Sequence, residues 1–228
     1  MAGNQIGLPI KHDFLIVNDA YIKQKEFVFR KYGVEVGDEK KALKFFPQLK
    51  TKVFDNRANF SVRYNTVADD VIPTIEGDEI VWQDEYTAVK FGDSKKGFNM
   101  GLVLKHKPLS RYIEYTIDSK GLIFLKEAES DEELAKELGL SYKELKEGRP
   151  DNVTRSISAW YDKDIVDISR KEYQTGKAFH IYRPFLIDSK GNSCYGEIDI
   201  ISGKLVVEIP KQFHANAKYP VLIDPAEV

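Results

Sequence analysis

Short runs in which apolar and polar residues alternate dominate the second half of the chain. Runs of this kind, rich in β-branched and aromatic residues, are typical of half-buried β-strands. They cover residues 98–105, 112–118, 122–126, 181–187, 194–201 and 205–209. Turn sequences containing glycine separate them at residues 118–121 and 188–191, both DSKG, and at 202–204. In the first of these, Gly121 stands where a turn commonly needs a left-handed residue. Three hairpin-like turns predict an antiparallel sheet rather than β-α-β units.

One segment between these strands has a helical pattern instead. The sequences SDEE from Ser130 and SYKE from Ser141 each resemble a capping box, in which a serine and a glutamate three residues later cap a helix. Leu134 and Leu138 are four residues apart and would share one helix face. We therefore expect residues 130–148 to form a two-helix insertion that is a lid or an edge cover on the β domain.

The first half of the chain is less regular. Residues 14–17 and 26–30 are expected to be short strands, and residues 38–46 a short helix that Pro47 ends. Further strands are expected at residues 59–64, 79–82 and 87–91. The predicted fold class is mainly β: an antiparallel, jelly-roll-like β sandwich over residues 50–228, with residues 1–49 as an N-terminal arm or extension.

Composition narrows the possible partners. With 34 Lys+Arg against 36 Asp+Glu, the formal net charge is −2, which lacks the basic surplus of a dedicated nucleic-acid-binding protein. Apolar residues make up 42% of the chain, but none of their runs reaches the roughly 20 residues that span a bilayer. The first residues lack the pattern of a secretory signal peptide. We therefore expect a protein made in a reducing cytosol, with no nucleic-acid and no membrane partner.

The sequence offers little catalytic chemistry. It contains no nucleophile elbow, phosphate-binding loop or zinc-protease motif. The single cysteine, Cys194, can form no internal disulfide and is expected to be a small strand residue. No two histidines have a metal-binding spacing. Alternation places His180 opposite the face of Phe179 and Ile181, as a strand-surface residue or a cross-strand partner rather than a ligand. We therefore predict no catalytic residue, no metal site and no cofactor.

Carboxylates and aromatic residues leave one alternative open. Glu197 and Asp199 share a strand face and could form a glycosidase pair, although charged, solvated strand faces are the more common arrangement. Trp82, Trp160 and Tyr161 are candidates for stacking on a sugar ring, or else for core and inter-subunit contacts. The alternative function is thus a carbohydrate-binding or carbohydrate-cleaving β-sandwich protein.

The order of motifs in the C-terminal half provides a resemblance. The motifs are RPDNV at residues 149–153, YQTGKAFHIYRP at 173–184, and FHANAKYP at 213–220 running into YPVLIDP at 219–225. In this order they resemble poorly characterised phage- and prophage-associated proteins, over about residues 98–225. The resemblance implies a β-sandwich structural protein of the virion and contributes no catalytic residue.

Together these observations favour a non-enzymatic virion structural protein of a tailed phage. Capsid decoration, the head–tail junction and the tail are all open positions for it. Its expected partners are other virion proteins or further copies of itself in a homo-oligomer. Its expected location is the virion, after assembly in the host cytoplasm.

Overall fold

The structure is a computed structural model of the 228-residue chain. It describes residues 9–10, 16–17, 20–21, 27–28, 34–36, 48–53, 58–64, 66, 71, 73–76, 79–94, 97–162, 165–166, 172–173 and 177–225, with side-chain detail confined to 58–162 and 177–224 within those ranges. The helix expected at residues 38–46 lies outside the described residues. None of the described helices is long and apolar enough to cross a membrane.

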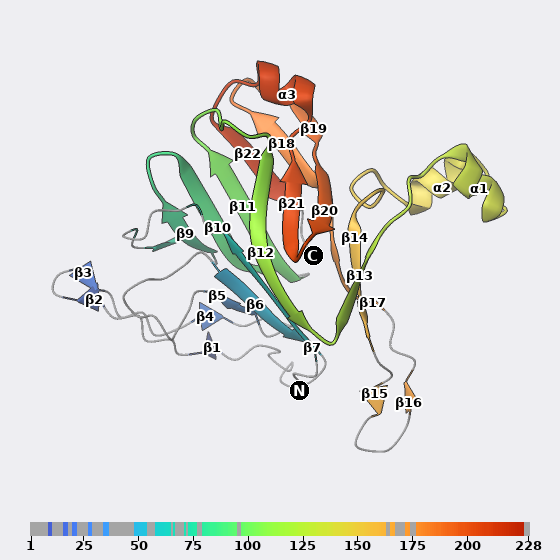
Figure 1. The fold of residues 1–228 in the computed structure, drawn as a ribbon, viewed down its shortest axis with the longest axis horizontal. Coiled ribbons are helices and arrows are strands. Elements are labelled where there is room, and N and C mark those ends of the chain that lie inside the picture. Colours follow the sequence, from blue (N-terminus) through green and yellow to red (C-terminus); the bar gives the residue numbers. More distant parts are fainter. Residues whose placement is uncertain are drawn as a thin grey trace, which may run out of the picture.

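Two antiparallel sheets form the body of the protein (Figure 1). The seven-stranded sheet has the order β19-β18-β22-β11-β10-β9-β8. Its strands are β8 (Thr74–Glu76), β9 (Glu79–Gln83), β10 (Thr87–Ser94), β11 (Gly97–Leu104), β18 (Pro184–Asp188), β19 (Ser193–Tyr195) and β22 (Val221–Pro225). The six-stranded sheet has the order β20-β21-β12-β7-β6-β5. Its strands are β5 (Val34–Val36), β6 (Gln48–Val53), β7 (Ala58–Tyr64), β12 (Tyr112–Lys120), β20 (Glu197–Ile201) and β21 (Lys204–Glu208).

Smaller elements extend from this body. A three-stranded sheet consists of β13 (Leu122–Lys126), β14 (Ile157–Tyr161) and β17 (Lys177–Ile181). Two-stranded pairs are formed by β1 (Pro9–Ile10) with β4 (Phe27–Val28), β2 (Ile16–Val17) with β3 (Ala20–Tyr21), and β15 (Ile165–Val166) with β16 (Glu172–Tyr173). The helices are α1 (Glu132–Glu137), α2 (Tyr142–Gly148) and α3 (Lys211–Asn216).

The predicted antiparallel β sandwich is confirmed. After β10 the chain crosses directly between the two larger sheets three times, at β11–β12, at β19–β20 and, through α3, at β21–β22. It crosses once more through the three-stranded sheet, from β12 to β18. Inward-facing residues alternate along the strands, as in β7, where Ala58, Phe60, Val62 and Tyr64 are all buried. The six-stranded sheet already includes β5 and β6, so it begins before the boundary at residues 49/50, which itself stays a prediction.

Phe60 lies where the three sheets meet. Its ring centroid is 6.2 Å from that of Phe98 in the seven-stranded sheet. It is 5.8 Å from that of Phe124 and 5.3 Å from that of Phe179, both in the three-stranded sheet. Aromatic pairs at about 4.5–7 Å attract one another beyond the effect of burial alone. The rings therefore join all three sheets in one core.

The three predicted turns have different outcomes. Residues 188–191 and 202–204 connect paired strands, β18 with β19 and β20 with β21, as expected for hairpins. The turn at 118–121 is not a hairpin, because β12 pairs with β7 through Lys120 while β13 pairs with β14. Gly121 does adopt the expected left-handed conformation, with φ 71°. It redirects the chain from the six-stranded sheet into the three-stranded sheet.

The predicted strand over residues 181–187 is also divided between two sheets. β17 ends at Ile181 and β18 begins at Pro184. Proline lacks an amide hydrogen and is tolerated at the first position of a strand. The YQTGKAFHIYRP motif thus ends where the chain passes into the seven-stranded sheet.

The two-helix insertion is confirmed, but its first cap is not the predicted one. α2 begins with the expected capping box, in which the Glu144 carboxylate accepts from the Ser141 amide at 2.8 Å. α1 is capped by Asp131, whose carboxylate accepts from the Leu134 amide at 2.8 Å. Ser130 instead forms a buried hydrogen bond with another segment. The prediction failed because a carboxylate one residue further along takes the capping position.

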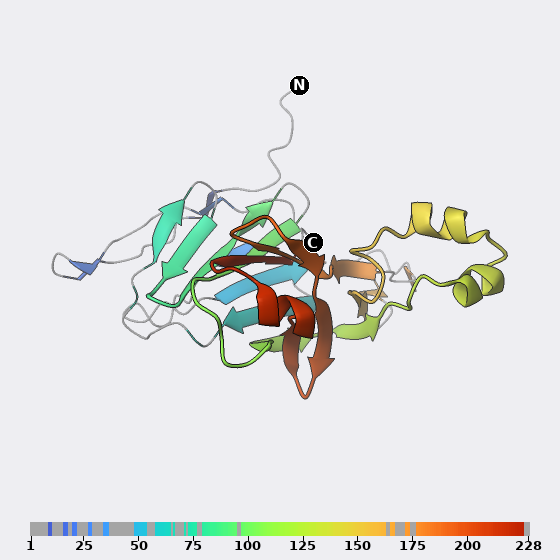
Figure 2. The ribbon, with the colours of Figure 1, turned by 90° about the horizontal axis from the view of Figure 1, so that it is seen from above.

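The insertion does not cover an edge of the sandwich. Figures 1 and 2 both show α1 and α2 standing away from the two larger sheets, beyond the end of the three-stranded sheet. Within the pair, Ala135 and Leu145 are the buried residues. The predicted packing position Leu138 is 55% exposed. We call α1, α2 and their connection, residues 131–148, the helical arm.

Candidate functional site: the polar cluster at the base of the helical arm

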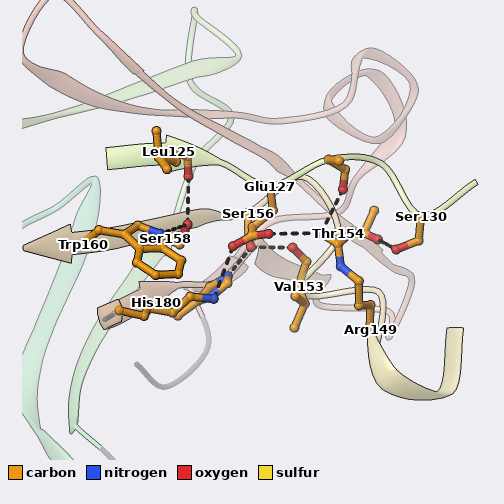
Figure 3. Close-up of polar contacts among 12 residues, drawn as sticks. Leu125, Glu127, Ser130, Arg149, Val153, Thr154, Ser156, Ser158, Trp160 and His180 are labelled. Atoms are coloured by element: carbon orange, nitrogen blue, oxygen red, sulfur yellow. Dashed lines mark hydrogen bonds and ion pairs between the residues drawn. The ribbon is translucent and has the colours of Figure 1, made fainter. Parts of the chain in front are cut away.

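Polar side chains gather where the helical arm joins the three-stranded sheet, and Ser156, Ser158 and His180 among them are buried (Figure 3). We call this group the polar cluster, and it consists of Glu127, Arg149, Ser156, Ser158, Lys177 and His180. Strand register brings these segments together, since Ser158 pairs with Leu125 on one side and with His180 on the other. Because side chains alternate along a strand, Ser158 and His180 share the face opposite Phe179.

Ser156 and His180 are in direct contact. Ser156 is fully buried, His180 is 8% exposed, and the serine Oγ lies within hydrogen-bond reach of the histidine Nε2. The same hydroxyl donates to the carbonyl oxygen of Val153. On the other side of the ring, Nδ1 lies 3.3 Å from Nζ of Lys177. Of the two roles expected for His180, strand-surface residue and cross-strand partner, the structure shows the second, since the residue is buried and pairs across the sheet with Ser158.

The direction of each hydrogen bond follows from what the end groups can do. A lysine ammonium only donates, so Nδ1 of His180 accepts and the ring hydrogen resides on Nε2. The ring therefore donates to Ser156, and the serine hydroxyl donates to the Val153 carbonyl, which only accepts. A nucleophilic serine needs the opposite arrangement, in which its hydroxyl donates to a histidine base. The contact thus stabilises the structure without activating the serine.

Charge and burial hold His180 in this neutral form. Burial, followed by the positive charge of Lys177, lowers the pKa of His180 to about 4, and the opposing effect of the nearby Glu127 carboxylate is smaller. The pKa of Glu127 is determined by a different balance of effects. Burial raises its pKa, but hydrogen bonds from Ser158 and Lys177 outweigh that effect and leave the carboxyl pKa below its ordinary value.

Glu127 connects the cluster to the base of the arm. Its carboxylate lies 3.3 Å from Nζ of Lys177 and 3.2 Å from a guanidinium nitrogen of Arg149. Its amide donates to the carbonyl of Ser156 at 2.9 Å. One residue on, Ala128 accepts from Arg149 at 3.2 Å. Both ends of the insertion are therefore fixed to the same carboxylate and its neighbouring backbone.

A second buried pair reinforces this junction. Ser130 and Thr154 are each 6% exposed, and their hydroxyl groups are hydrogen-bonded to each other. They stand at opposite ends of the insertion, 24 residues apart in sequence. Buried hydroxyls without partners destabilise a fold, so this mutual bond favours a single arrangement of the two ends. Residues 127–130 and 149–156 thus form a clamped stem for the arm.

Arg183 ties the stem to the sandwich. It is 7% exposed and donates from Nε to the carbonyl oxygen of Gly196 at 3.0 Å and from a terminal nitrogen to Glu197 at 2.8 Å. Glu197 also pairs with Arg155 of the stem at 2.9 Å. Because Glu197 lies on β20, the network links the stem with the six-stranded sheet.

Gly196 occupies the crossing from β19 to β20, where space is minimal. An added Cβ would lie 2.9 Å from Cδ1 of Leu186, 3.0 Å from Cγ of Pro184 and 3.1 Å from the carbonyl oxygen of Glu208. Beside it, Cys194 is half-buried on β19 and unpaired by any disulfide. Burial raises the pKa of its thiol, in accord with the expected small strand residue.

The three aromatic candidates for sugar binding are not brought together. Trp82 is fully buried in the core and presents no face to a ligand. Trp160 and Tyr161 are partly buried neighbours on β14, so their side chains point to opposite faces. The Trp160 indole nitrogen donates to Ser158 at 2.9 Å, and the Lys177 ammonium lies 5.6 Å from the ring centroid. The residues do not form one stacking platform.

The carboxylates considered for a glycosidase pair have basic partners. Glu197 lies between Arg183 and Arg155, and Asp199 pairs with Lys126 at 3.1 Å. Among the residues that the structure describes, no three histidine, cysteine, aspartate or glutamate side chains converge as metal ligands do. The charged strand faces are thus arranged as ion pairs.

Sequence reasoning did not single out Ser156, Lys177 or Arg183. Ser156 lies directly before the first residue of β14, so the alternation of that strand indicates its direction only in part. A partial signal exists in the alternation of Ser156 and Ser158, which places two hydroxyls on one side of the chain opposite Ile157. Comparison with protein-family models, curated proteins and solved structures finds no match to the chain.

Proposed function

We propose that this protein is a non-enzymatic structural component of a tailed-phage virion that acts through protein–protein contacts. The observation that carries the proposal is the helical arm, which projects from the sandwich on a clamped stem (Figure 1). Capsid decoration, the head–tail junction and the tail remain the positions that fit such a component.

The arm contributes little to the core, and its surface suits a partner. Apart from Ala135 and Leu145, its apolar residues are wholly or partly open to solvent. Leu138, Leu140 and Tyr142 are 55%, 43% and 45% exposed within one short stretch. Exposed apolar groups gathered in this way are typical of interaction surfaces. A clamped stem holds that surface in one orientation, which reduces the entropy lost on binding.

The motif residues that resemble phage-associated proteins have structural positions here. Phe213 and Tyr219 are partly buried against the main core, and β22 begins directly after Pro220. The RPDNV motif lies in the stem, where the carbonyl of Asn152 accepts from the Arg183 amide at 2.9 Å. These roles support a scaffold function for the motifs.

The test is whether the chain is part of a particle. Particles would be purified from the organism that carries the gene, by density gradient, and the chain quantified by mass spectrometry. We expect a fixed copy number per particle. A second sample would carry a variant whose residues 131–148 are replaced by a flexible glycine–serine linker. That variant should fold, as judged by fluorescence of the buried Trp82, yet be depleted from particles.

A chain found only in the fraction free of particles would refute the proposal. Undiminished incorporation of the linker variant would refute the role of the arm.

A further inference from the structure

The helical arm carries an excess of negative charge around its exposed apolar residues. Residues 131–148 contain six carboxylates against three lysines, a net charge of −3. Glu133 and Glu137 are exposed and lie four residues apart, on one face of α1. Leu138 and Leu140 follow directly. The arm is thus an apolar patch with an acidic rim.

The opposite character is found at the end of the sandwich near α3. We call residues 105–111 and 208–218 the basic end. They contain five lysine or arginine residues against one glutamate, a net charge of +4. His214 of α3 lies 3.0 Å from the Pro108 carbonyl oxygen, and the Ile209 amide donates to the Arg111 carbonyl at 2.8 Å, so the two segments are held together.

An apolar residue projects from the basic end as well. Leu109 is fully exposed, at 106% of its reference area, between Lys107 and Arg111. Lys107, two residues before Leu109, and Lys211, at the start of α3, are both exposed in the same end. The basic end therefore mirrors the arm, with an apolar centre and a rim of the opposite charge.

The arm and the basic end cannot meet within one molecule as it is folded. α3 and the pair α1–α2 lie apart in both views of the ribbon (Figures 1 and 2). The clamped stem fixes the arm in that position. Two complementary surfaces that lie apart on one molecule can still bind each other between two copies of the chain.

We propose that the helical arm of one copy binds the basic end of a second copy of this chain, head to tail. The inference rests on the proposed structural function and names its partner. Contact between two arms would bring like charges together, as would contact between two basic ends, so charge selects the heterologous pairing. A heterologous contact repeats until it closes into a ring or continues as a filament.

Charge reversal tests this pairing directly. Sedimentation velocity of the purified full chain should show mass rising with concentration, and less so at high salt, since salt screens exposed charges. Glu133→Lys with Glu137→Lys on the arm, or Lys107→Glu with Lys211→Glu on the basic end, should each weaken self-association by at least about tenfold. Asp118→Lys with Lys120→Glu, on exposed positions of β12, is the matched control and should leave association unchanged.

Mixing the two reversed variants gives the decisive result. The unmodified basic end of the arm variant then faces the unmodified arm of the other variant, as in the wild type. The reversed arm, with a net charge of +1, faces a basic end whose net charge has fallen from +4 to 0 and no longer repels it. Association should therefore return on mixing, although each variant alone associates at least about tenfold more weakly than the wild type. Circular dichroism of each variant verifies that it is folded.

Three outcomes overturn the inference. One is a monomer at every soluble concentration, the second is association insensitive to the charge reversals, and the third is no recovery on mixing. The proposed virion role is tested separately, because a monomer that is incorporated into particles would refute head-to-tail pairing and leave that role intact.

Discussion

Replacing His180 by glutamine should remove a pH-dependent loss of stability from the protein. In the folded chain His180 is neutral, because burial and Lys177 lower its pKa to about 4 from an ordinary value of 6.5. Above pH 6.5 the ring is neutral in both states and has no effect. Between pH 6.5 and 4 the unfolded chain binds a proton that the folded chain does not. The free energy of unfolding therefore decreases as the pH is lowered from 6.5 to 4.

The size of the effect follows from the pKa difference. Each pKa unit corresponds to about 1.4 kcal/mol, so the full effect approaches about 3 kcal/mol near pH 4. At pH 5 the loss attributable to His180 is about 2 kcal/mol. This is a large fraction of the 5–15 kcal/mol that is typical of a folded domain, on the order of one part in five.

Urea denaturation at pH 7, 6 and 5, followed by tryptophan fluorescence, measures this difference. Carboxylate titrations are common to both proteins and cancel when the wild type is compared with His180→Gln. The wild type should lose about 2 kcal/mol more than the variant between pH 7 and pH 5. His106→Gln is the matched control, since His106 is exposed, and it should follow the wild type. Parallel stability profiles for the wild type and His180→Gln would refute the proposed proton arrangement of the polar cluster.

Other substitutions test the core, the crossing from β19 to β20 and the helical arm. The same denaturation assay measures the first two, and amide exchange follows α2 in the arm. Phe60→Ala removes the ring shared by three sheets and should cost about 3–5 kcal/mol, whereas Leu109→Ala at an exposed position should stay within about 0.5 kcal/mol of the wild type. Gly196→Ala should destabilise by about 1–3 kcal/mol, because its Cβ meets backbone and proline atoms, and Gly148→Ala, which meets nothing within 4 Å, should be neutral or slightly stabilising. Ser141→Ala should weaken α2 by about 1 kcal/mol, visible as faster amide exchange in that helix with no change in the sandwich. A loss at Gly148 equal to that at Gly196, or unchanged exchange in α2, would contradict the corresponding argument.

Local sequence patterns were sufficient for much of the fold. Alternation located the strands, and the capping box at Ser141 was right because both of its partners lie within one helical turn. The left-handed glycine at Gly121 was also anticipated. What followed that glycine was not, since pairing of β12 with β7 and of β13 with β14 depends on residues far away in sequence.

In the polar cluster, too, local patterns predicted some features, whereas others depend on residues far away in sequence. Alternation placed His180 on the correct face, yet its partner Ser156 lies 24 residues away in an irregular segment. Ser130 was misassigned for a related reason, because its hydroxyl is taken by Thr154 and the cap passes to Asp131. Trp82 is part of the core. The sequence alone could not distinguish a tryptophan in the core from one exposed for stacking on a ligand.

Because of the clamped stem, the helical arm can change in evolution without changes in the sandwich. Glu127, Ser130, Thr154 and Ser156 close the insertion without any residue of α1 or α2 taking part in those bonds. Lengthening a closed loop adds only about 0.6 kcal/mol for each doubling. Helices of other lengths and charges can therefore replace the present pair with little effect on the sheets. One β sandwich could in this way acquire a new binding specificity by exchanging only the insertion, about twenty residues.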